Sequence, residues 1–234
     1  MVPPPIAVFD LDGTLADTAP DLIGTLNVIL AREGLLPVRL ADVRDMIGAG
    51  ARALVARGFE GAGRELTPAK SDELFRDFIL HYGKNICRES RLFPGAEEAL
   101  DELAAMGFRL AVCTNKVEDL SRRLLEELGV AGRFAAICGR DTFPYAKPDG
   151  RHLTMTVAAA GGDPARAVMV GDSGTDIAAA RDAGVPVVGV TFGYTDVPVR
   201  DLGPDLVVDG FPELPGALAS LRLGGPAGGG RDRD

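Results

Sequence analysis

The sequence predicts an α/β fold in which helices cover both faces of a parallel sheet and a long helical segment is inserted near the N-terminus. Three observations support this prediction. Short apolar runs recur along the chain, and they alternate with stretches whose apolar residues have helical spacing. Strands that alternate with helices form parallel sheets covered on both faces. Residues 17–89, by contrast, contain no β-rich run.

Five apolar runs predict the buried strands of the sheet, and they lie at residues 6–9, 110–113, 167–170, 187–190 and 206–208. Helical patterns flank them at residues 95–106, 117–128 and 174–183. Asp10 follows the first run, Thr114 the second and Asp172 the third, after one glycine. Ligands of parallel sheets bind outside the carboxyl ends of the strands. We therefore expect these three polar residues to face one crevice.

Residues 17–89 are predicted to form an all-helical insert. Apolar pairs such as Leu22-Ile23 and Phe78-Ile79 recur at helical spacing, with glycines and prolines between the helices. We expect a catalytic core at residues 1–16 and 90–223 and the insert at 17–89. Residues 224–234 are rich in glycine and charge, which predicts a disordered tail.

Composition limits the classes of partner. The 234 residues include 25 basic and 34 acidic side chains, for a formal charge of −9, which argues against nucleic-acid polymers and anionic membranes. The N-terminus does not resemble a signal peptide, and no segment approaches ~20 uncharged apolar residues. The three cysteines are widely spaced, which favours reduced, buried thiols in a cytoplasmic protein. We expect the two histidines, His81 and His152, on helix surfaces.

The segment Asp10-Leu11-Asp12-Gly13-Thr14 places two carboxylates directly after the first predicted strand. At ~4 Å and an effective dielectric near 20, such like charges repel by about 4 kcal/mol. A bound cation would offset this repulsion and leave one carboxylate as a nucleophile and the other as an acid/base. The alternative interpretation is an acidic loop in which Asp12 or Thr14 caps a helix.

The segment from Gly171 to Asp176 follows the third predicted strand. Asp172 is placed as Asp10 is, and two carboxylates there make an oxygen site suited to Mg²⁺. Asp176, one helical turn later, is predicted to support that site together with Ser173. Helix capping by Asp172 or Ser173 is the alternative.

Thr114-Asn115 follows the second predicted strand and provides a hydroxyl and backbone N–H groups for an anion. Lys147 lies in a polar loop and is the cation that a phosphate site requires, with Pro148 after it. Taken alone, these residues are also consistent with helix capping and with a solvated surface charge.

The order and spacing of these segments resemble those of the haloacid dehalogenase superfamily of phosphohydrolases, which have a Rossmann-like core and an inserted cap. Within that superfamily the phosphoglycolate phosphatases are the more similar group. The residues that carry this closer resemblance are 9–22, 47–54 in the insert, and Phe192-Gly193-Tyr194.

The resemblance implies a role for each matching residue. Asp10 attacks phosphorus, and Asp12 protonates the leaving group and then activates water. Mg²⁺ is held by the Asp10 carboxylate, the Asp12 main-chain carbonyl and Asp172. Thr114, Asn115 and Lys147 bind the phosphoryl oxygens, which makes Thr114 and Lys147 catalytic as well. The implied partner is a small phosphorylated metabolite, with the protein a monomer or a homodimer.

Several alternatives remain at this point. A dehalogenase would not need Asp12 or the metal, so their presence disfavours it. A phosphonatase would need a lysine of the insert, but Lys70 and Lys84 are the lysines there and neither lies in the glycine loop. A sugar-phosphate phosphatase or a phosphomutase shares the same core. A non-catalytic metabolite-binding regulator is the alternative of another class, although such a protein would be expected to lack Asp10 or Asp12. For phosphoglycolate itself, we hypothesise that Gly48 and Arg52 lie over the site and bind the carboxylate.

Overall fold

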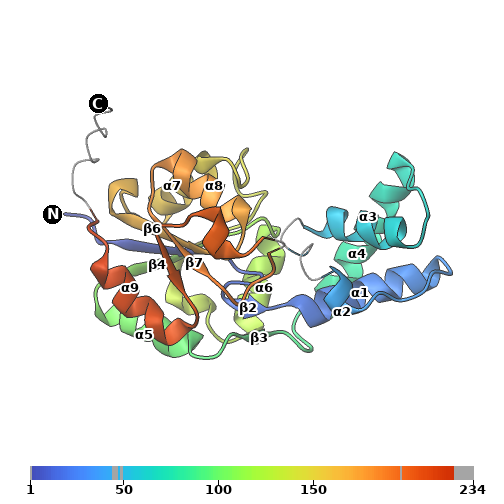
Figure 1. The fold of residues 1–234 in the computed structure, drawn as a ribbon, viewed down its shortest axis with the longest axis horizontal. Helices are drawn as coiled ribbons and strands as arrows, with labels where there is room; N and C mark the ends of the chain where they lie inside the picture. The colour runs from blue at the N-terminus through green and yellow to red at the C-terminus, as the bar shows by residue number, and fades with distance from the viewer. Residues whose placement is uncertain (1, 44–46, 48–49, 196, 224–234) are drawn as a thin grey trace.

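The computed structural model describes residues 2–43, 47, 50–195 and 197–223. Its centre is a six-stranded parallel sheet of order β5-β4-β1-β6-β7-β8 (Figure 1). The strands are β1 Ile6–Phe9, β4 Arg109–Cys113, β5 Phe134–Cys138, β6 Ala167–Gly171, β7 Val187–Val190 and β8 Leu206–Val208. β1 lies in the middle and pairs with both β4 and β6, so the three strands that precede the predicted site residues are neighbours.

Successive side chains of β1 point to opposite faces of the sheet, and each face is covered by its own hydrophobic cluster. Ala7 and Phe9 belong to one hydrophobic cluster, and Ile6 and Val8 belong to the other. Helices α5, α6 and α9 contribute to the first cluster, and α7 and α8 to the second. Their bounds are α5 Ala96–Ala105, α6 Glu118–Glu127, α7 Gly150–Ala159, α8 Gly174–Ala183 and α9 Leu214–Ser220. The predicted helical layers on both faces of a parallel sheet are thus confirmed.

Among the residues that the structure describes, four helices lie between β1 and the remaining strands of the sheet: α1 Ala19–Arg32, α2 Leu40–Val43, α3 Ala51–Gly61 and α4 Pro68–Lys84. We call these four helices the helical insert. Each of the two longest has Pro in its first turn, where a missing N–H costs nothing, and the Thr67 hydroxyl caps α4. Figure 1 shows the insert to one side of the sheet, beyond the carboxyl ends of the strands.

A two-stranded antiparallel ribbon joins the insert to the sheet. It consists of β2 (Ala16–Asp17) and β3 (Arg91–Leu92), where the chain leaves the core and where it returns. Two strands of two residues are weak alone, and the sequence pattern does not predict them. The five predicted strands are present, whereas β5 was not predicted. Its sequence, with Ala135 and Ala136 at its centre, has little of the β-branched character typical of strands.

The prediction for His152 is wrong. This residue lies on α7 but has no exposed surface, because α7 packs against α8, β4 and β5. His81 on α4 is half-buried, with its Nδ1 3.3 Å from the Thr25 hydroxyl. All three cysteines are free, with Cys113 and Cys138 buried on β4 and β5. The domain bounds stay predictions, and residues 224–234 lie outside the described chain.

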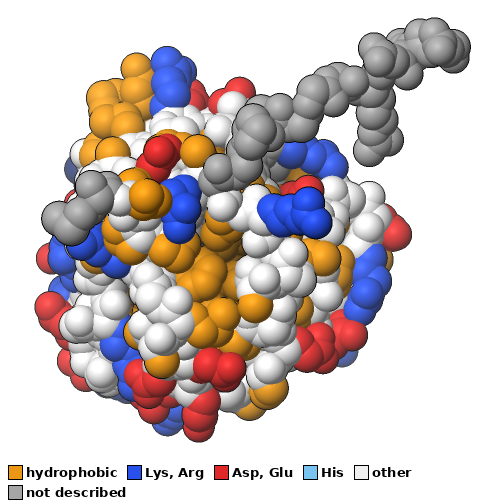
Figure 2. Space-filling view, turned by 90° about the vertical axis from the view of Figure 1, so that its left-hand side faces the viewer, with side chains coloured by type: hydrophobic (Ala, Val, Ile, Leu, Met, Phe, Trp, Pro, Cys, Tyr) orange, Lys and Arg blue, Asp and Glu red, His pale blue; other side chains and the backbone are white. Residues whose placement is uncertain are grey.

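The end of the core that carries both termini shows no large field of one charge. Figure 2 looks onto this end, where acidic and basic side chains surround a central group of hydrophobic ones. Within the described residues, no helix is both long enough and apolar enough to cross a membrane.

Candidate active site

Asp10, Thr114 and Asp172 follow β1, β4 and β6, and all three side chains are buried at the carboxyl edge of the sheet. The Asp10 amide donates to the Val170 carbonyl at 2.9 Å, and that of Thr114 to the Cys138 carbonyl at 3.0 Å. These bonds continue the ladders by one residue, so the strands themselves position the side chains. The sequence prediction that the three residues converge is consistent with this geometry.

Lys147 reaches into the same crevice from the loop before α7. Its ammonium nitrogen is 2.9 Å from Asp10 Oδ1 and 2.5 Å from Asp176 Oδ1, and its side chain is 2% exposed. Burial alone would lower the pKa of Lys147, but the two carboxylates outweigh burial and raise it. Lys147 is therefore a permanent cation in this site. The side-chain amide of Asn115 donates to the main-chain carbonyl of Lys147 at 3.0 Å.

Asp172 and Asp176 are oriented by hydrogen bonds to neighbouring loops. Asp172 accepts from the Thr14 hydroxyl at 2.8 Å and from the Tyr194 amide at 2.7 Å. Asp176, at the start of α8, accepts from the Ser173 amide at 3.1 Å and the Ser173 hydroxyl at 2.7 Å. Ser173 is also the N-cap residue of α8, so the capping alternative and the supporting role both apply to it.

Asp10, Asp172 and Asp176 form a cluster in which one carboxylate oxygen from each residue lies within 4.8 Å of those of the other two. Burial raises the pKa of Asp10 to about 6, with the neighbouring carboxylates adding to burial and Lys147 opposing it. Burial, followed by the charges of Asp176 and Asp10, raises the pKa of Asp172 to about 7. Buried carboxylates that disfavour one another's charge are the environment that a divalent cation relieves.

The donor set fits a hard cation. Asp10 Oδ1 is buried and accepts no hydrogen bond of good geometry from the described residues, although Lys147 is within ion-pair distance. Asp176, which was predicted only to support the site, is itself a member of this carboxylate cluster. The side chain of Asp12 is not in the group, but its predicted contribution is a main-chain carbonyl, to which this finding does not apply.

Gly193 fits closely against Asp172 of the carboxylate cluster. A Cβ built on Gly193 would overlap the side chain of Asp172, and no other residue type could lie there without moving that carboxylate. This explains in physical terms one part of the Phe192-Gly193-Tyr194 resemblance. The hydroxyl of Tyr194 also bonds to Asp17 and accepts from the Ala19 amide at 3.0 Å, which ties this loop to the start of the insert.

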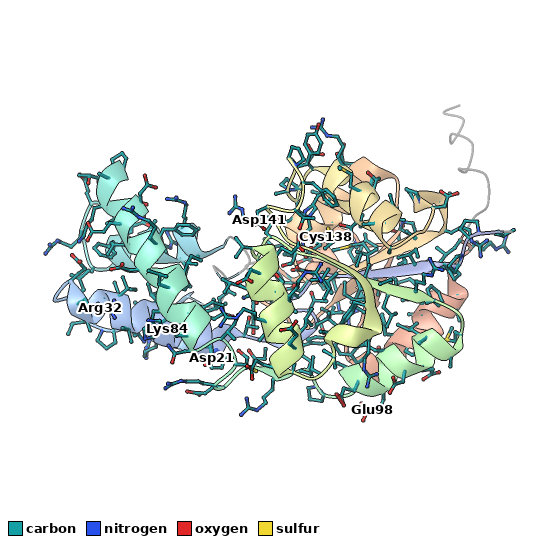
Figure 3. All side chains as sticks on the ribbon, turned by 180° about the vertical axis from the view of Figure 1, so that it is seen from behind. Asp21, Arg32, Lys84, Glu98, Cys138 and Asp141 are labelled. Carbon is teal, nitrogen blue, oxygen red and sulfur yellow. The ribbon has the colours of Figure 1, made fainter. Side chains whose placement is uncertain are left out.

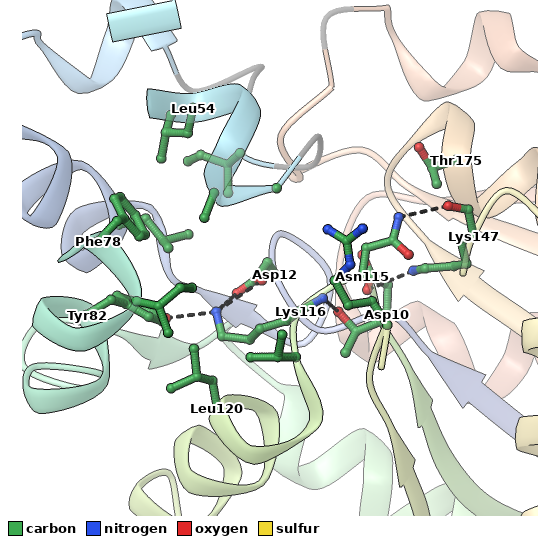
Figure 4. Close-up of a pocket in the computed structure, with 18 of the residues that line it drawn as sticks. Asp10, Asp12, Leu54, Phe78, Tyr82, Asn115, Lys116, Leu120, Lys147 and Thr175 are labelled. Atoms are coloured by element: carbon green, nitrogen blue, oxygen red, sulfur yellow. Dashed lines mark hydrogen bonds and ion pairs between the residues drawn. The ribbon is translucent and has the colours of Figure 1, made fainter. Parts of the chain in front are cut away.

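The Asp12 side chain faces away from the carboxylate cluster of Asp10, Asp172 and Asp176 and towards the insert. It accepts from the Thr18 hydroxyl at 2.7 Å and from the Lys116 ammonium at 2.9 and 3.1 Å. Lys116 also donates to the Tyr82 hydroxyl of α4 at 2.8 Å (Figure 4). The sequence analysis did not single out Lys116, although its position after Thr114-Asn115 was a signal that could have been followed.

The crevice opens into a pocket between the core and the helical insert (Figure 4). The core supplies polar groups, among them Asp10, Asn115 and Lys147. The insert supplies a largely apolar wall that includes Leu22, Ile47, Leu54, Phe75, Phe78 and Ile79. The pocket is thus charged on one side and apolar on the other.

Arg52, one of the two predicted carboxylate-binding residues, is not among the described residues that line this pocket. The Arg52 guanidinium pairs with Asp72 at 2.6 Å and lies 4.2 Å over the Phe75 ring, and both residues of that pair are exposed. Gly48 lies outside the described residues, while its neighbours Ile47 and Gly50 line the pocket. The role given to Gly48 and Arg52 stays a prediction from the sequence.

A further buried acid, Asp21, lies at the base of the insert and was not predicted (Figure 3). Its carboxylate accepts from the Ser90 amide at 2.9 Å, from the Ser90 hydroxyl at 2.7 Å and from the Glu89 amide at 3.1 Å. Asp21 thus ties the first turn of α1 to the segment that re-enters the core. Its role is to hold the insert against the core, outside the pocket.

Comparison with known proteins shows which family and which proteins this chain resembles. Residues 7–190 match the model of the haloacid dehalogenase-like hydrolases. The chain is 52% identical to the phosphoglycolate phosphatase of Agrobacterium fabrum over 92% of both chains. It is also 52% identical to that of Caulobacter vibrioides, over 94% of this chain and 92% of the relative. A crystal structure described as a predicted phosphoglycolate phosphatase from Haemophilus somnus superposes with a TM-score of 0.83, at 35% identity over 89% of this chain and 95% of the other.

Proposed function

The chain belongs to the haloacid dehalogenase-like hydrolases, and from this we propose that it hydrolyses 2-phosphoglycolate to glycolate and phosphate, with Mg²⁺ as the metal. The observation that carries the proposal is the position of Asp10, which lies 2.9 Å from Lys147, belongs to a cluster of three carboxylates and lines the pocket between the core and the insert. The relatives named phosphoglycolate phosphatase match over nearly the whole chain, so the insert as well as the core is shared with them.

In the first chemical step, we assign Asp10 as the nucleophile. Its carboxylate oxygen bonds to phosphorus while the bond from phosphorus to the glycolate oxygen breaks, which leaves an aspartyl-phosphate. Asp12 gives a proton to the departing alkoxide. In the second step, Asp12 takes a proton from water, which attacks phosphorus and releases Asp10 and inorganic phosphate.

The remaining core residues hold the phosphoryl group. The Thr114 hydroxyl, the Asn115 amide and the Lys147 ammonium are proposed to bind its oxygens, with Asp176 keeping Lys147 in position at 2.5 Å. Mg²⁺ would be held by Asp10, Asp172 and the Asp12 carbonyl, and it would neutralise charge on the phosphoryl oxygens. Ser173 orients Asp176 through its amide and hydroxyl.

The insert is proposed to act as a cap that closes over the leaving group and excludes water. Because the pocket lies between the core and the insert, substrate choice is expected to depend on both. The free cysteines support a cytoplasmic location, where thiols stay reduced.

A panel of small phosphomonoesters with Mg²⁺, assayed for phosphate release, tests the proposal. We expect the highest kcat/KM with 2-phosphoglycolate and loss of turnover in excess EDTA. Far faster turnover of a hexose phosphate would instead favour the sugar-phosphate alternative. Absence of activity on every ester would favour the non-catalytic regulator.

A further inference from the structure

Lys116 is a buried cation in the pocket for which the roles above give no use. Its side chain is 6% exposed, and it extends from the loop after β4 towards the insert (Figure 4). Its ammonium donates to both oxygens of Asp12 and to the Tyr82 hydroxyl. Paired with Asp12 in this way, Lys116 is a cation in a site that is otherwise apolar on the side of the insert.

Tyr82 adds a second donor at the same place. Its side chain is 1% exposed, and burial raises the pKa of its hydroxyl to about 12, so it stays protonated. Because Lys116 donates to the Tyr82 oxygen, the hydroxyl proton itself remains free for another acceptor; among the described residues none is found to accept it. An ammonium and a hydroxyl thus lie 2.8 Å apart in the pocket, a pair of donors that suits a carboxylate.

The position of Lys116 matches the dimensions of 2-phosphoglycolate. The carboxyl carbon of that molecule is three bonds from phosphorus, so the group that binds it must lie close to the phosphoryl site. Lys116 is two residues from Thr114, and its amide donates to the Thr114 hydroxyl at 3.2 Å. Lys116 therefore extends from the loop that is proposed to hold the phosphoryl oxygens.

Three other described cations are less suited than Lys116 to bind a substrate carboxylate. Lys147 is held between Asp10 and Asp176. Arg52 is exposed and paired with Asp72. Arg140 lines the pocket, but it is exposed at the mouth, where solvent weakens an ion pair.

The apolar side chains of the pocket limit which other groups the substrate can carry. Leu54 and Phe78 of the insert and Leu120 of the core helix α6 line the same pocket as Lys116, and they offer no partners for the hydroxyl groups of a sugar. Buried hydroxyls without partners are costly, so this wall disfavours sugar phosphates and tolerates a methylene group.

We propose that Lys116 and Tyr82 bind the carboxylate of the substrate, and that this binding draws the Lys116 ammonium away from Asp12. The inference rests on the proposed function and specifies how its substrate is selected. In this structure Asp12 is the anion that Lys116 holds, and a substrate carboxylate competes with it for the same ammonium group. A phosphoglycolate molecule would thereby release Asp12 for proton transfer, whereas an ester without a carboxylate would not.

The test compares Lys116→Met and Lys116→Arg with the parent enzyme on 2-phosphoglycolate and on 2-hydroxyethyl phosphate, its neutral counterpart. Loss of a charge-assisted contact of this kind costs ~10- to 100-fold in binding. We expect the ratio of kcat/KM between the two substrates to fall by that factor in Lys116→Met and to recover partly in Lys116→Arg. Equal losses on both substrates would mean that Lys116 only positions Asp12, and would overturn the proposal.

Arg140→Met is the matched control, because it removes the other pocket-lining cation that has no assigned role. We expect its substrate ratio to stay within about threefold of that of the parent. A selective loss in Arg140→Met, with none in Lys116→Met, would identify Arg140 as the carboxylate-binding residue instead.

A binding measurement separates recognition from proton transfer. In an Asp10→Asn background, calorimetric titration with 2-phosphoglycolate should show weaker binding when Lys116→Met is added, and unchanged affinities would overturn the proposal. Failure of the proposed function has a different signature: the parent enzyme would release phosphate from another ester but none from 2-phosphoglycolate.

Discussion

The two sides of the pocket differ in how their side chains are held. On the core side, Asp10 and Asp172 follow strand ends, and Lys147 connects to Asp10 through an ion pair at 2.9 Å. Asp172 is held by the Thr14 hydroxyl and the Tyr194 amide. On the insert side, the wall is apolar, and the polar contact described between it and the core is that of Lys116 with Tyr82. We infer that the core determines the reaction and that the insert determines which ester undergoes it.

The difference also concerns rigidity. The core residues lie in a parallel sheet whose ladders and two hydrophobic clusters constrain the backbone on both sides. The insert is attached through the short β2–β3 ribbon, through polar contacts of Asp21, Tyr194 and Tyr82, and through apolar side chains that share a hydrophobic cluster with one face of the core. Movement of the insert as a body is therefore expected to be easier than rearrangement of the core. The predictions below test this division, from the largest expected effect to the smallest.

Asp10→Asn should abolish turnover on every substrate, because it removes the nucleophile. We expect kcat to fall by ~10⁴-fold or more, irrespective of whether the ester carries a carboxylate. Phosphate release measures the loss, and circular dichroism checks that the fold is retained. Residual activity that depends on the leaving group would contradict the assignment of chemistry to the core alone.

Lys147→Met should destabilise the protein as well as inactivate it. Without the ammonium group, Asp10 and Asp176 would be left as buried carboxylates with no cation beside them. Removing one partner of a buried ion pair costs about 3–5 kcal/mol. Urea unfolding in EDTA measures the change, and Lys84→Met, at an exposed lysine on α4, is the control with an expected change below about 0.5 kcal/mol.

Stabilisation by Mg²⁺ should increase with pH. In the metal-free protein the pKa values of Asp10 and Asp172 are raised to about 6 and 7. A raised carboxyl pKa contributes stability below the unfolded value of 3.8, and this contribution is lost as pH rises through the folded value. Protons therefore compete with the metal at pH 5 but not at pH 8.

Thermal unfolding with Mg²⁺ and with EDTA at the two pH values measures this effect. We expect the Tm difference between the two conditions to be at least ~3 °C larger at pH 8 than at pH 5. The same difference at both pH values would mean that these carboxylates do not bind the metal.

Arg52→Ala should have the smallest effect. Its guanidinium lies on Asp72, an exposed pair, and such pairs contribute about 0–1 kcal/mol. We expect less than a twofold change in kcat/KM, equal on 2-phosphoglycolate and p-nitrophenyl phosphate. A selective loss on 2-phosphoglycolate would instead restore the sequence-based hypothesis that Arg52 binds the carboxylate.

Much of the core was predictable from local sequence signals. The apolar runs that became β1, β4 and β6 are each followed by a polar residue, and this pattern alone predicts which residues lie at the carboxyl edge of the sheet. Asp10, Thr114 and Asp172 were found in this way. The pattern is informative because a strand buried on both faces must be apolar, so a polar residue marks its end.

Contacts between segments far apart in the chain were not predictable. The bonds of Asp21 to Ser90 and of Lys116 to Tyr82 join residues 69 and 34 positions apart. No periodicity marks either pair, because each depends on how α1 and α4 pack against the core. The burial of His152 depends in the same way on the packing of α7.

The sequence by itself determined five strands of the sheet, the helical character of the insert and the residues that follow β1, β4 and β6, because hydrophobic periodicity and strand termination are local properties. The tertiary structure alone decided which side chains meet across the pocket. It brought Asp176 into the carboxylate group, turned Asp12 towards Lys116 and placed Arg52 on Asp72. The physical reason is that a charge takes the nearest available partner, and which partner is nearest is fixed only when the insert has packed on the core.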